Sequence, residues 1–225
     1  MTDKVTTTFR TKSIRLKKAR GMTNSSQRWM SRHLNDPYVQ EAQKKGYRSR
    51  AAFKIMEIDD KYKLLKSGQV IVELGAAPGG WSQVVARKIK AGQGNARLIG
   101  IDLLPVEPIE GAVFLVGDFL EKECQEEVLN LAGGSVDLVL SDMAAGTTGH
   151  KSTDHIRTMN LAEAAFLFAK ETLKPGGAFV AKVFQGGTDK ELLDQLKIYF
   201  AQIKHCKPPA SRQESPEMYV VCMGF

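Results

Sequence analysis

Cysteine and histidine are scarce in this chain and scattered along it. Its 225 residues include three cysteines, Cys124, Cys206 and Cys222, and four histidines. No cysteine has a second cysteine or a histidine at the spacing that zinc sites use. This scarcity argues against a structural zinc and against a disulfide framework, so we expect no metal and a reducing compartment.

Long apolar runs and repeats are also missing. Apolar residues make up 43% of the chain, but no run reaches the roughly 20 residues that a membrane helix needs, and no apolar segment typical of a secretory signal is present. We therefore expect one soluble core without a membrane partner, and a monomer without an obligate protein partner. A mitochondrial transit peptide has a composition similar to the N-terminus, but Asp3 and the lack of an amphipathic face favour the cytoplasm.

Acidic residues are rare in the first part of the chain. Residues 1–50 contain thirteen lysines and arginines against three acids, a net charge of +10, which leaves −3 for the remaining 175 residues. Residues 1–27 are also weakly periodic, which predicts a flexible basic arm on a near-neutral domain. The usual partner of such an arm is a polyanion, so nucleic acid is the leading candidate. A charge run that only aids solubility is the alternative.

An apolar strand runs directly into a glycine-rich turn at residues 69–81, Gln-Val-Ile-Val-Glu-Leu-Gly-Ala-Ala-Pro-Gly-Gly-Trp. Gly75 supplies a tight turn, and Gly79 lets the backbone approach a ligand where a helix begins at Trp81. The dinucleotide fingerprint has glycine at the third position, which is alanine here, and Pro78 removes an amide donor, so NAD is disfavoured. S-adenosylmethionine has no phosphate and suits the loop better; a turn used only for packing is the alternative.

Strand-like and helical segments alternate along the rest of the chain. The predicted strands are Val70–Leu74, Arg97–Leu103, Val113–Phe119, Val136–Asp142, Ala178–Phe184 and Met218–Phe225. The predicted helices are Trp81–Ile89, Glu121–Leu131, Asp154–Leu173 and Asp189–Phe200, after a basic helical segment at 28–66. This alternation predicts one α/β domain over 28–225, with a mostly parallel sheet of about seven strands and helices on both faces. The last strand is expected to be an antiparallel edge strand.

Three carboxylates end predicted strands on what should be one rim of the sheet. Asp102, Asp118 and Asp142 hold these positions, and ligands of such sheets bind outside the carboxyl ends of the strands. A single strand-end aspartate is often only a cap, but three together repel one another unless a ligand or cation satisfies them. Lys182, within the fifth predicted strand, is unusual at a buried position unless it is paired. Asp142 and Glu217 are its candidate partners, and exposure to solvent is the alternative.

Together these motifs resemble the FtsJ-type ribosomal RNA 2′-O-ribose methyltransferases. The resemblance extends from about Ser26 to the C-terminus and is carried by Tyr38–Lys54, Leu74–Trp81, Asp102–Pro105, Gly117–Phe119, Ser141–Met143 and Lys182–Gly186. It implies the Rossmann-like class I fold of S-adenosylmethionine-dependent methyltransferases. It also implies methyl transfer to a ribose hydroxyl, with a uridine in the peptidyl-transferase region of the large ribosomal subunit as the acceptor.

The resemblance also implies roles for individual residues. The catalytic set falls on Lys54, Asp142, Lys182 and Glu217, with Lys182 as the expected base. The cofactor contacts fall on Gly79, Trp81, Asp102, Asp118 and Asp142, and the glycine loop adds Gly75. A base must be neutral, which the neighbouring Lys54 favours and the two carboxylates oppose. A charged Lys182 would instead orient the hydroxyl and stabilise the developing charge on its oxygen.

We therefore expect an enzyme that methylates ribosomal RNA during maturation of the large ribosomal subunit. A non-catalytic RNA-binding or ribosome-assembly protein on the same fold is the first alternative, and the complete set of four residue types argues against it. An NAD-dependent oxidoreductase is the second alternative, which the broken glycine fingerprint disfavours.

Overall fold

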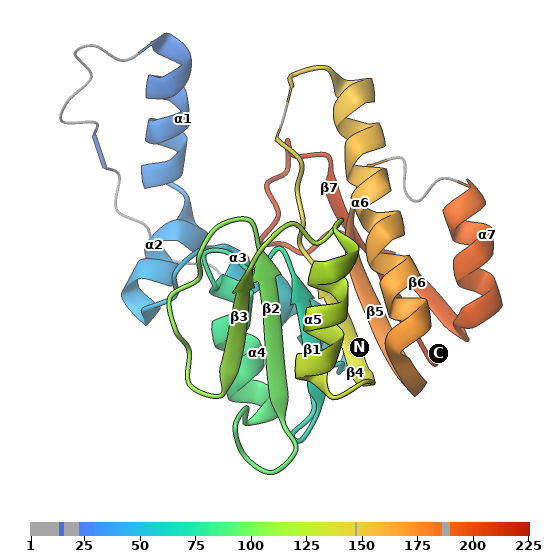
Figure 1. The fold of residues 1–225 in the computed structure, drawn as a ribbon. Coiled ribbons are helices and arrows are strands. Elements are labelled where there is room, and N and C mark those ends of the chain that lie inside the picture. Colours follow the sequence, from blue (N-terminus) through green and yellow to red (C-terminus); the bar gives the residue numbers. More distant parts are fainter. Residues whose placement is uncertain (1–13, 16–22, 147, 186–189) are drawn as a thin grey trace, which may run out of the picture.

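A single sheet organises the molecule (Figure 1). The computed structural model describes residues 14–15, 23–146, 148–185 and 190–225, so most of the predicted basic arm lies outside the described residues. Within them, seven strands follow the order β3-β2-β1-β4-β5-β7-β6. Their bounds are β1 (Val70–Leu74), β2 (Arg97–Asp102), β3 (Ala112–Val116), β4 (Val136–Ser141), β5 (Leu173–Phe184), β6 (Gln202–Cys206) and β7 (Glu217–Met223). The first five strands pair in parallel, and β7 runs antiparallel to both β5 and β6.

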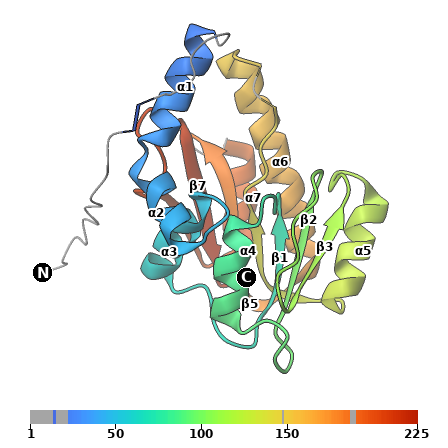
Figure 2. The same cartoon turned by 90° about the vertical axis from the view of Figure 1, so that its left-hand side faces the viewer.

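Helices cover both faces of this sheet (Figures 1 and 2). One face carries α3 (Ala51–Tyr62) and α4 (Gly80–Ile89), and the other carries α5 (Lys122–Ala132), α6 (Lys151–Thr172) and α7 (Lys190–Tyr199). Each face has its own apolar core, because every residue of β1 is buried and alternate side chains pack on opposite helices. The predicted Rossmann-like α/β fold is confirmed, and each predicted helix is found close to its predicted ends.

The prediction that the last strand forms the edge of the sheet is wrong. Its antiparallel direction is confirmed, but β7 lies inside the sheet, and β6 forms the edge beyond it. Tyr219 to Cys222 of β7 are completely buried, which requires cover on both sides. The sequence of β6, Gln-Ile-Lys-His-Cys, is mostly polar and exposed, so it gave no strand signal.

Three helices precede the first strand, in and before the segment predicted to be helical. Besides α3 they are α1 (Asn24–Leu34) and α2 (Pro37–Lys45). Thr23 caps α1 by accepting a hydrogen bond from the N–H of Ser26, so the helix begins within the stretch assigned to the arm. Asp36 caps α2 in the same way, followed by proline at the first helical position. Figure 2 shows α1 projecting away from the sheet beyond α2. None of the described helices has the length and apolarity needed to cross a bilayer.

The strand order reverses between β1 and β4, and Gly75 lies at this point. Its φ of +79° belongs to the left-handed region, and a Cβ at this position would lie 2.8 Å from the Cα of Met143. Only glycine lets the ends of β1 and β4 approach so closely. In open α/β sheets the ligand crevice opens at such a reversal.

Candidate active site

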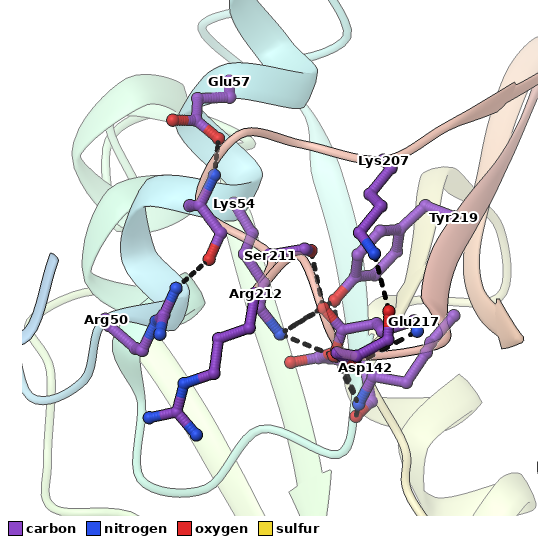
Figure 3. A network of polar contacts seen from close by, with 12 residues as sticks. Arg50, Lys54, Glu57, Asp142, Lys207, Ser211, Arg212, Glu217 and Tyr219 are labelled. Carbon is purple, nitrogen blue, oxygen red and sulfur yellow. Dashed lines mark hydrogen bonds and ion pairs between the residues drawn. The ribbon is translucent and has the colours of Figure 1, made fainter. Parts of the chain in front are cut away.

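Two lysines and two acids from distant parts of the chain meet beside the reversal point. Lys54 comes from α3, Asp142 follows β4, Lys182 lies near the end of β5 and Glu217 begins β7. The Lys182 Nζ lies 2.8 Å from Asp142 Oδ1 and 4.0 Å from Glu217 Oε2, and Lys54 Nζ lies 2.8 Å from Glu217 Oε1. Figure 3 shows part of this network, with Lys54, Asp142 and Glu217 labelled. The structure thus brings together all four residues of the predicted catalytic set.

Lys182 is paired and nearly buried, with a side chain only 8% exposed. Besides its contact with the Asp142 carboxylate, its Nζ donates to the main-chain oxygen of Asp142 at 2.8 Å. An ammonium group has three donors, so the two contacts with Asp142 leave a third N–H for another acceptor. This arrangement confirms Asp142 as a partner of Lys182.

Tyr219 joins this network and was missed by the sequence reasoning. Its hydroxyl donates to Asp142 Oδ1 at 2.7 Å and lies 3.3 Å from Lys54 Nζ. In the β5–β7 register Tyr219 stands directly opposite Lys182, and Glu217 lies two residues away on the same face. The available signal was this spacing of two, which puts Glu217 and Tyr219 on one side of a strand. The predicted strand began at Met218, one residue too late to include Glu217.

Opposing effects act on the ionisation of Asp142. Burial by itself would raise the pKa of this carboxyl, but the positive charges of Lys182 and Lys54, with hydrogen bonds from Lys182 and Tyr219, lower it below its ordinary value. Burial, reinforced by the charges of Asp142 and Glu217, raises the pKa of Tyr219 well above its ordinary value. Asp142 is therefore held as the anion, and Tyr219 keeps its proton as a donor.

A large open pocket adjoins Lys182. Its volume is about 1010 Å³, and its lining includes His155 and Thr158 of α6, Phe184 of β5, and Glu217. Arg32 of α1 lies 3.7 Å from Glu214 in the pocket wall, so α1 reaches the rim of this pocket through an ion pair. His155 was not singled out from the sequence, because only the fold brings α6 beside Lys182. Phe184 follows Lys182 by two residues in β5 and was not singled out either.

A second, smaller pocket lies at the ends of β1, β2 and β3. Its polar side chains are Asp102 and Asp118, and the rest of its lining is apolar or glycine: Gly75, Ile101, Leu103, Gly117, Phe119, Met143, Ala144 and Leu161. The Asp102 carboxylate accepts the N–H groups of Ala77 and Leu104, both at 2.9 Å, which fixes its orientation. Ala144 lines this pocket and the large one alike, so the two pockets are neighbours.

Three predicted cofactor contacts, Gly79, Trp81 and Asp142, are absent from the lining of this smaller pocket. Gly79 caps α4 with φ +100°, and a Cβ there would lie 2.6 Å from the Arg48 guanidinium. The Trp81 side chain is 2% exposed and packs in the core against Tyr219. The Gly79 N–H donates to the Ala76 carbonyl oxygen at 2.7 Å, so at most the main-chain N–H groups after it, at the start of α4, face a ligand. Among the described residues, no three histidine, cysteine or acidic side chains are grouped as metal ligands would be.

The residues of the smaller pocket fit S-adenosylmethionine better than a dinucleotide. The smaller pocket offers two carboxylates and no lysine or arginine, which suits hydroxyl and amino donors on a cationic ligand and disfavours a pyrophosphate. In the neighbouring pocket Lys182 lies between the carboxylates of Asp142 and Glu217, and its side chain lines the pocket, so it can contact a ligand bound there.

Comparison with known proteins identifies relatives along nearly the whole chain. The FtsJ-like methyltransferase family matches residues 47–225. A protein of Novosphingobium aromaticivorans named ribosomal RNA large subunit methyltransferase E is 58% identical over 94% of this chain and 93% of its own. The protein of the same name from Zymomonas mobilis is 57% identical, with 94% of each chain covered.

Solved structures agree. A crystal structure described as a ribosomal RNA methyltransferase from Plasmodium falciparum superposes with a TM-score of 0.69 at 30% identity, covering 80% of this chain and 98% of that one. The family match over residues 47–225, and relatives more than 50% identical along nearly the whole chain, show that the chain belongs to the FtsJ-like methyltransferase family.

Proposed function

We propose that this protein transfers a methyl group from S-adenosylmethionine to a ribose 2′-hydroxyl of large-subunit ribosomal RNA. The observation that carries the proposal is the pairing of Lys182 with Asp142 at 2.8 Å beside a pocket of about 1010 Å³. The smaller pocket with its two aspartates adjoins it through Ala144, so a donor and an acceptor can meet. The names of the relatives support ribosomal RNA of the large subunit as the acceptor.

The cofactor supplies an electrophilic methyl group when bound, so the protein has to position an oxygen nucleophile in line with it. Asp102 and Asp118 would hold the ribose and amino groups of the cofactor. Gly75 would admit it at the strand reversal, and main-chain N–H groups after Gly79 and at Trp81 would face it from the start of α4.

Lys182 would contact the acceptor hydroxyl. Its ammonium donates twice to Asp142, and we propose that its third N–H holds the 2′-oxygen and stabilises the charge that develops there. In this role the hydroxyl proton passes to water in the open pocket, as the oxygen forms its bond to the methyl carbon and the methyl–sulfur bond of the cofactor breaks. Glu217 and Lys54 would fix the position of this ammonium through their own ion pair. The alternative role, a neutral Lys182 that removes the proton, is distinguished by the pH dependence given below.

Transfer of a labelled methyl group tests the proposal. Purified protein is incubated with labelled S-adenosylmethionine and, separately, free large-subunit RNA, isolated large subunits and transfer RNA. We expect label in the large-subunit acceptors, on a nucleoside whose neighbouring linkage resists alkali because its 2′-oxygen is methylated, and we propose uridine. Binding to ribosomal particles without transfer would instead support a non-catalytic assembly protein. Equilibrium binding of S-adenosylmethionine and NAD compares the two cofactors directly.

A further inference from the structure

The loop between β6 and β7, residues 207–216, contains a buried serine aimed at the active site. Ser211 is only 5% exposed, and its hydroxyl donates to Glu217 Oε1 at 2.7 Å. The loop lies far in sequence from Lys54, Asp142 and Lys182. Figure 3 shows Ser211 beside Glu217 and Lys54.

This hydrogen bond fixes the rotation of a carboxylate that two lysines share. Lys54 Nζ lies 2.8 Å from both oxygens of Glu217, which are chemically equivalent. A second donor is therefore needed to set the plane of the carboxylate. The terminal torsion of a glutamate is broad, and the carboxylate can turn about it at little cost. Ser211 holds Oε1, which leaves Oε2 to face Lys182 Nζ at 4.0 Å.

Helix α3 holds the serine in place through the preceding residue. The N–H of Ala210 donates to Glu57 Oε2 at 2.7 Å, and its carbonyl oxygen accepts a hydrogen bond from Arg50. Arg50 stands at the start of α3, with Lys54 four residues and Glu57 seven residues further on, so all three share one helix face. The helix face that presents Lys54 to Glu217 thus also hydrogen-bonds both polar groups of the Ala210 backbone. Figure 3 shows Arg50, Lys54 and Glu57 on this face.

Residues at the start of α2 hold Arg50 and Glu57, the two partners of Ala210, in position. Arg50 pairs with the buried Asp36 at the start of α2, and the Tyr38 hydroxyl donates to Glu57 Oε1 at 3.0 Å. Burial, the largest effect, raises the pKa of Glu57, against opposing hydrogen bonds from Ala210 and Tyr38. Each partner of Ala210 is therefore held by another side chain.

We propose that Ser211 is a positioning residue of the methyl-transfer reaction. It acts through Glu217, whose carboxylate it orients toward Lys182. The hydrogen bonds of Arg50 and Glu57 to the Ala210 backbone fix the position of Ser211. The inference rests on the proposed function, because it assigns Ser211 a part in that reaction. Ser211 itself touches neither acceptor nor cofactor.

Single-turnover transfer by Ser211→Ala, Glu217→Ala and the double variant tests this role. We expect Ser211→Ala to lower the rate by about 10- to 100-fold, the range for a lost hydrogen bond to a charged group, with KM for both substrates nearly unchanged. In the double variant the rate should equal that of Glu217→Ala, because Glu217 is the one hydrogen-bond partner of the Ser211 hydroxyl among the described residues. Ser211→Thr, which keeps the hydroxyl, should recover most of the rate. Ser135→Ala makes the same change at an exposed position remote from the loop, and it should behave like wild type.

Urea unfolding of the same variants separates positioning from folding. A stability coupling between Ser211 and Glu217 without a rate coupling would reduce the contact to a structural one and overturn the proposal, as would additive rate losses. A wild type that transfers no methyl group to any acceptor would overturn the proposed function instead. If the wild type is active and Ser211→Ala retains the full rate, the positioning role of Ser211 is wrong while the proposed function stands.

Discussion

The hydroxyl of Tyr219 bridges the two halves of the four-residue network. It donates to Asp142 Oδ1 at 2.7 Å and lies 3.3 Å from Lys54 Nζ. Lys54 pairs with Glu217, and Asp142 pairs with Lys182, so this phenol joins the two ion pairs into one buried unit. An ion pair removed from water is stable only when its remaining donors and acceptors are satisfied, and Tyr219 satisfies one on each side.

Tyr219→Phe should therefore lower the unfolding free energy and the rate of methyl transfer, while the aromatic ring still fills its place in the core. Removing the hydroxyl deletes one donor to Asp142, and we expect a loss of about 1 to 3 kcal/mol in unfolding free energy and a slower methyl transfer. Urea unfolding and single-turnover kinetics measure the two effects. Tyr199→Phe is the control, since Tyr199 packs between aromatic rings of Phe166 and Phe225. Equal losses in both variants would contradict a special role for the Tyr219 hydroxyl.

Lys182→Ala should abolish transfer while S-adenosylmethionine binding stays near wild type. Lys182 lines the large pocket and is absent from the lining of the smaller one, so it should contact the acceptor and not the donor. Calorimetric titration with the cofactor checks the binding, and a failure to bind would contradict the assignment.

Lys182→Arg distinguishes the two roles of the lysine. Arginine keeps the positive charge but does not act as a base near neutral pH. If Lys182 orients the hydroxyl as a cation, the pH profile of the single-turnover rate should have the same shape in the variant and in wild type. A wild-type rate that rises with pH, with that rise absent in Lys182→Arg, would show a base instead.

Glu73 should make the protein less stable as pH rises. It is completely buried in β1, and burial, reinforced by the charges of Asp142 and Asp102, raises its pKa to about 8 despite the hydrogen bonds of Ser82. Between the ordinary pKa of about 4.3 and this value, the folded protein holds a proton that the unfolded chain has released. Stability then falls with increasing pH, by at most about 1.4 kcal/mol per pH unit.

Glu73→Gln should remove this slope and stabilise the protein near pH 8 relative to wild type. The glutamine retains an acceptor for the Ser82 hydroxyl, which donates to Glu73 at 2.8 Å. Urea unfolding at pH 6 and pH 8 measures the effect, and Glu171→Gln on the exposed side of α6 is the matched control. The same slope in wild type and Glu73→Gln would contradict the shifted pKa.

Gly75→Ala should cost more than the same change at Gly176. Both residues have φ near +80°, where alanine costs about 1 to 3 kcal/mol. A Cβ at Gly75 also meets the Met143 backbone at 2.8 Å, whereas none of the described atoms lies within 4 Å of one at Gly176. Thermal unfolding and cofactor titration should show a larger loss of stability, and weaker binding, only for Gly75→Ala. Equal effects would rule out the approach to Met143 as the cause.

Deletion of residues 1–22 should weaken RNA binding and flatten its salt dependence. The deleted stretch is rich in lysine and arginine, and the slope of log K against log salt should become shallower by about 0.7 to 0.9 for each phosphate that the arm neutralises. The deletion stops before Thr23, which caps α1. Filter binding over a range of salt concentrations measures the slope, and cofactor binding is the control. An unchanged slope would show that the arm only aids solubility.

Much of this protein could be predicted from local sequence. The buried β1 strand, the glycine turn after it and the alternation of strands with helices each depend on neighbouring residues, so the α/β fold was predictable. Lys182 could be singled out because a lysine in an apolar strand needs a partner. The edge strand β6 could not be predicted from the sequence, because its polar residues face solvent and only their pairing with β7 makes them a strand.

The sequence by itself predicted the type of site, through Gly75, through Asp102 at the end of β2 and through Asp142 after β4, because such residues depend on local backbone geometry. Only the tertiary structure decided which side chains come together in this site. Tyr219 enters through its register opposite Lys182, and Ser211 enters because α3 grips the Ala210 backbone. These contacts join residues far apart in the chain, and their distances are set by the packing of the sheet and helices, which no local pattern contains.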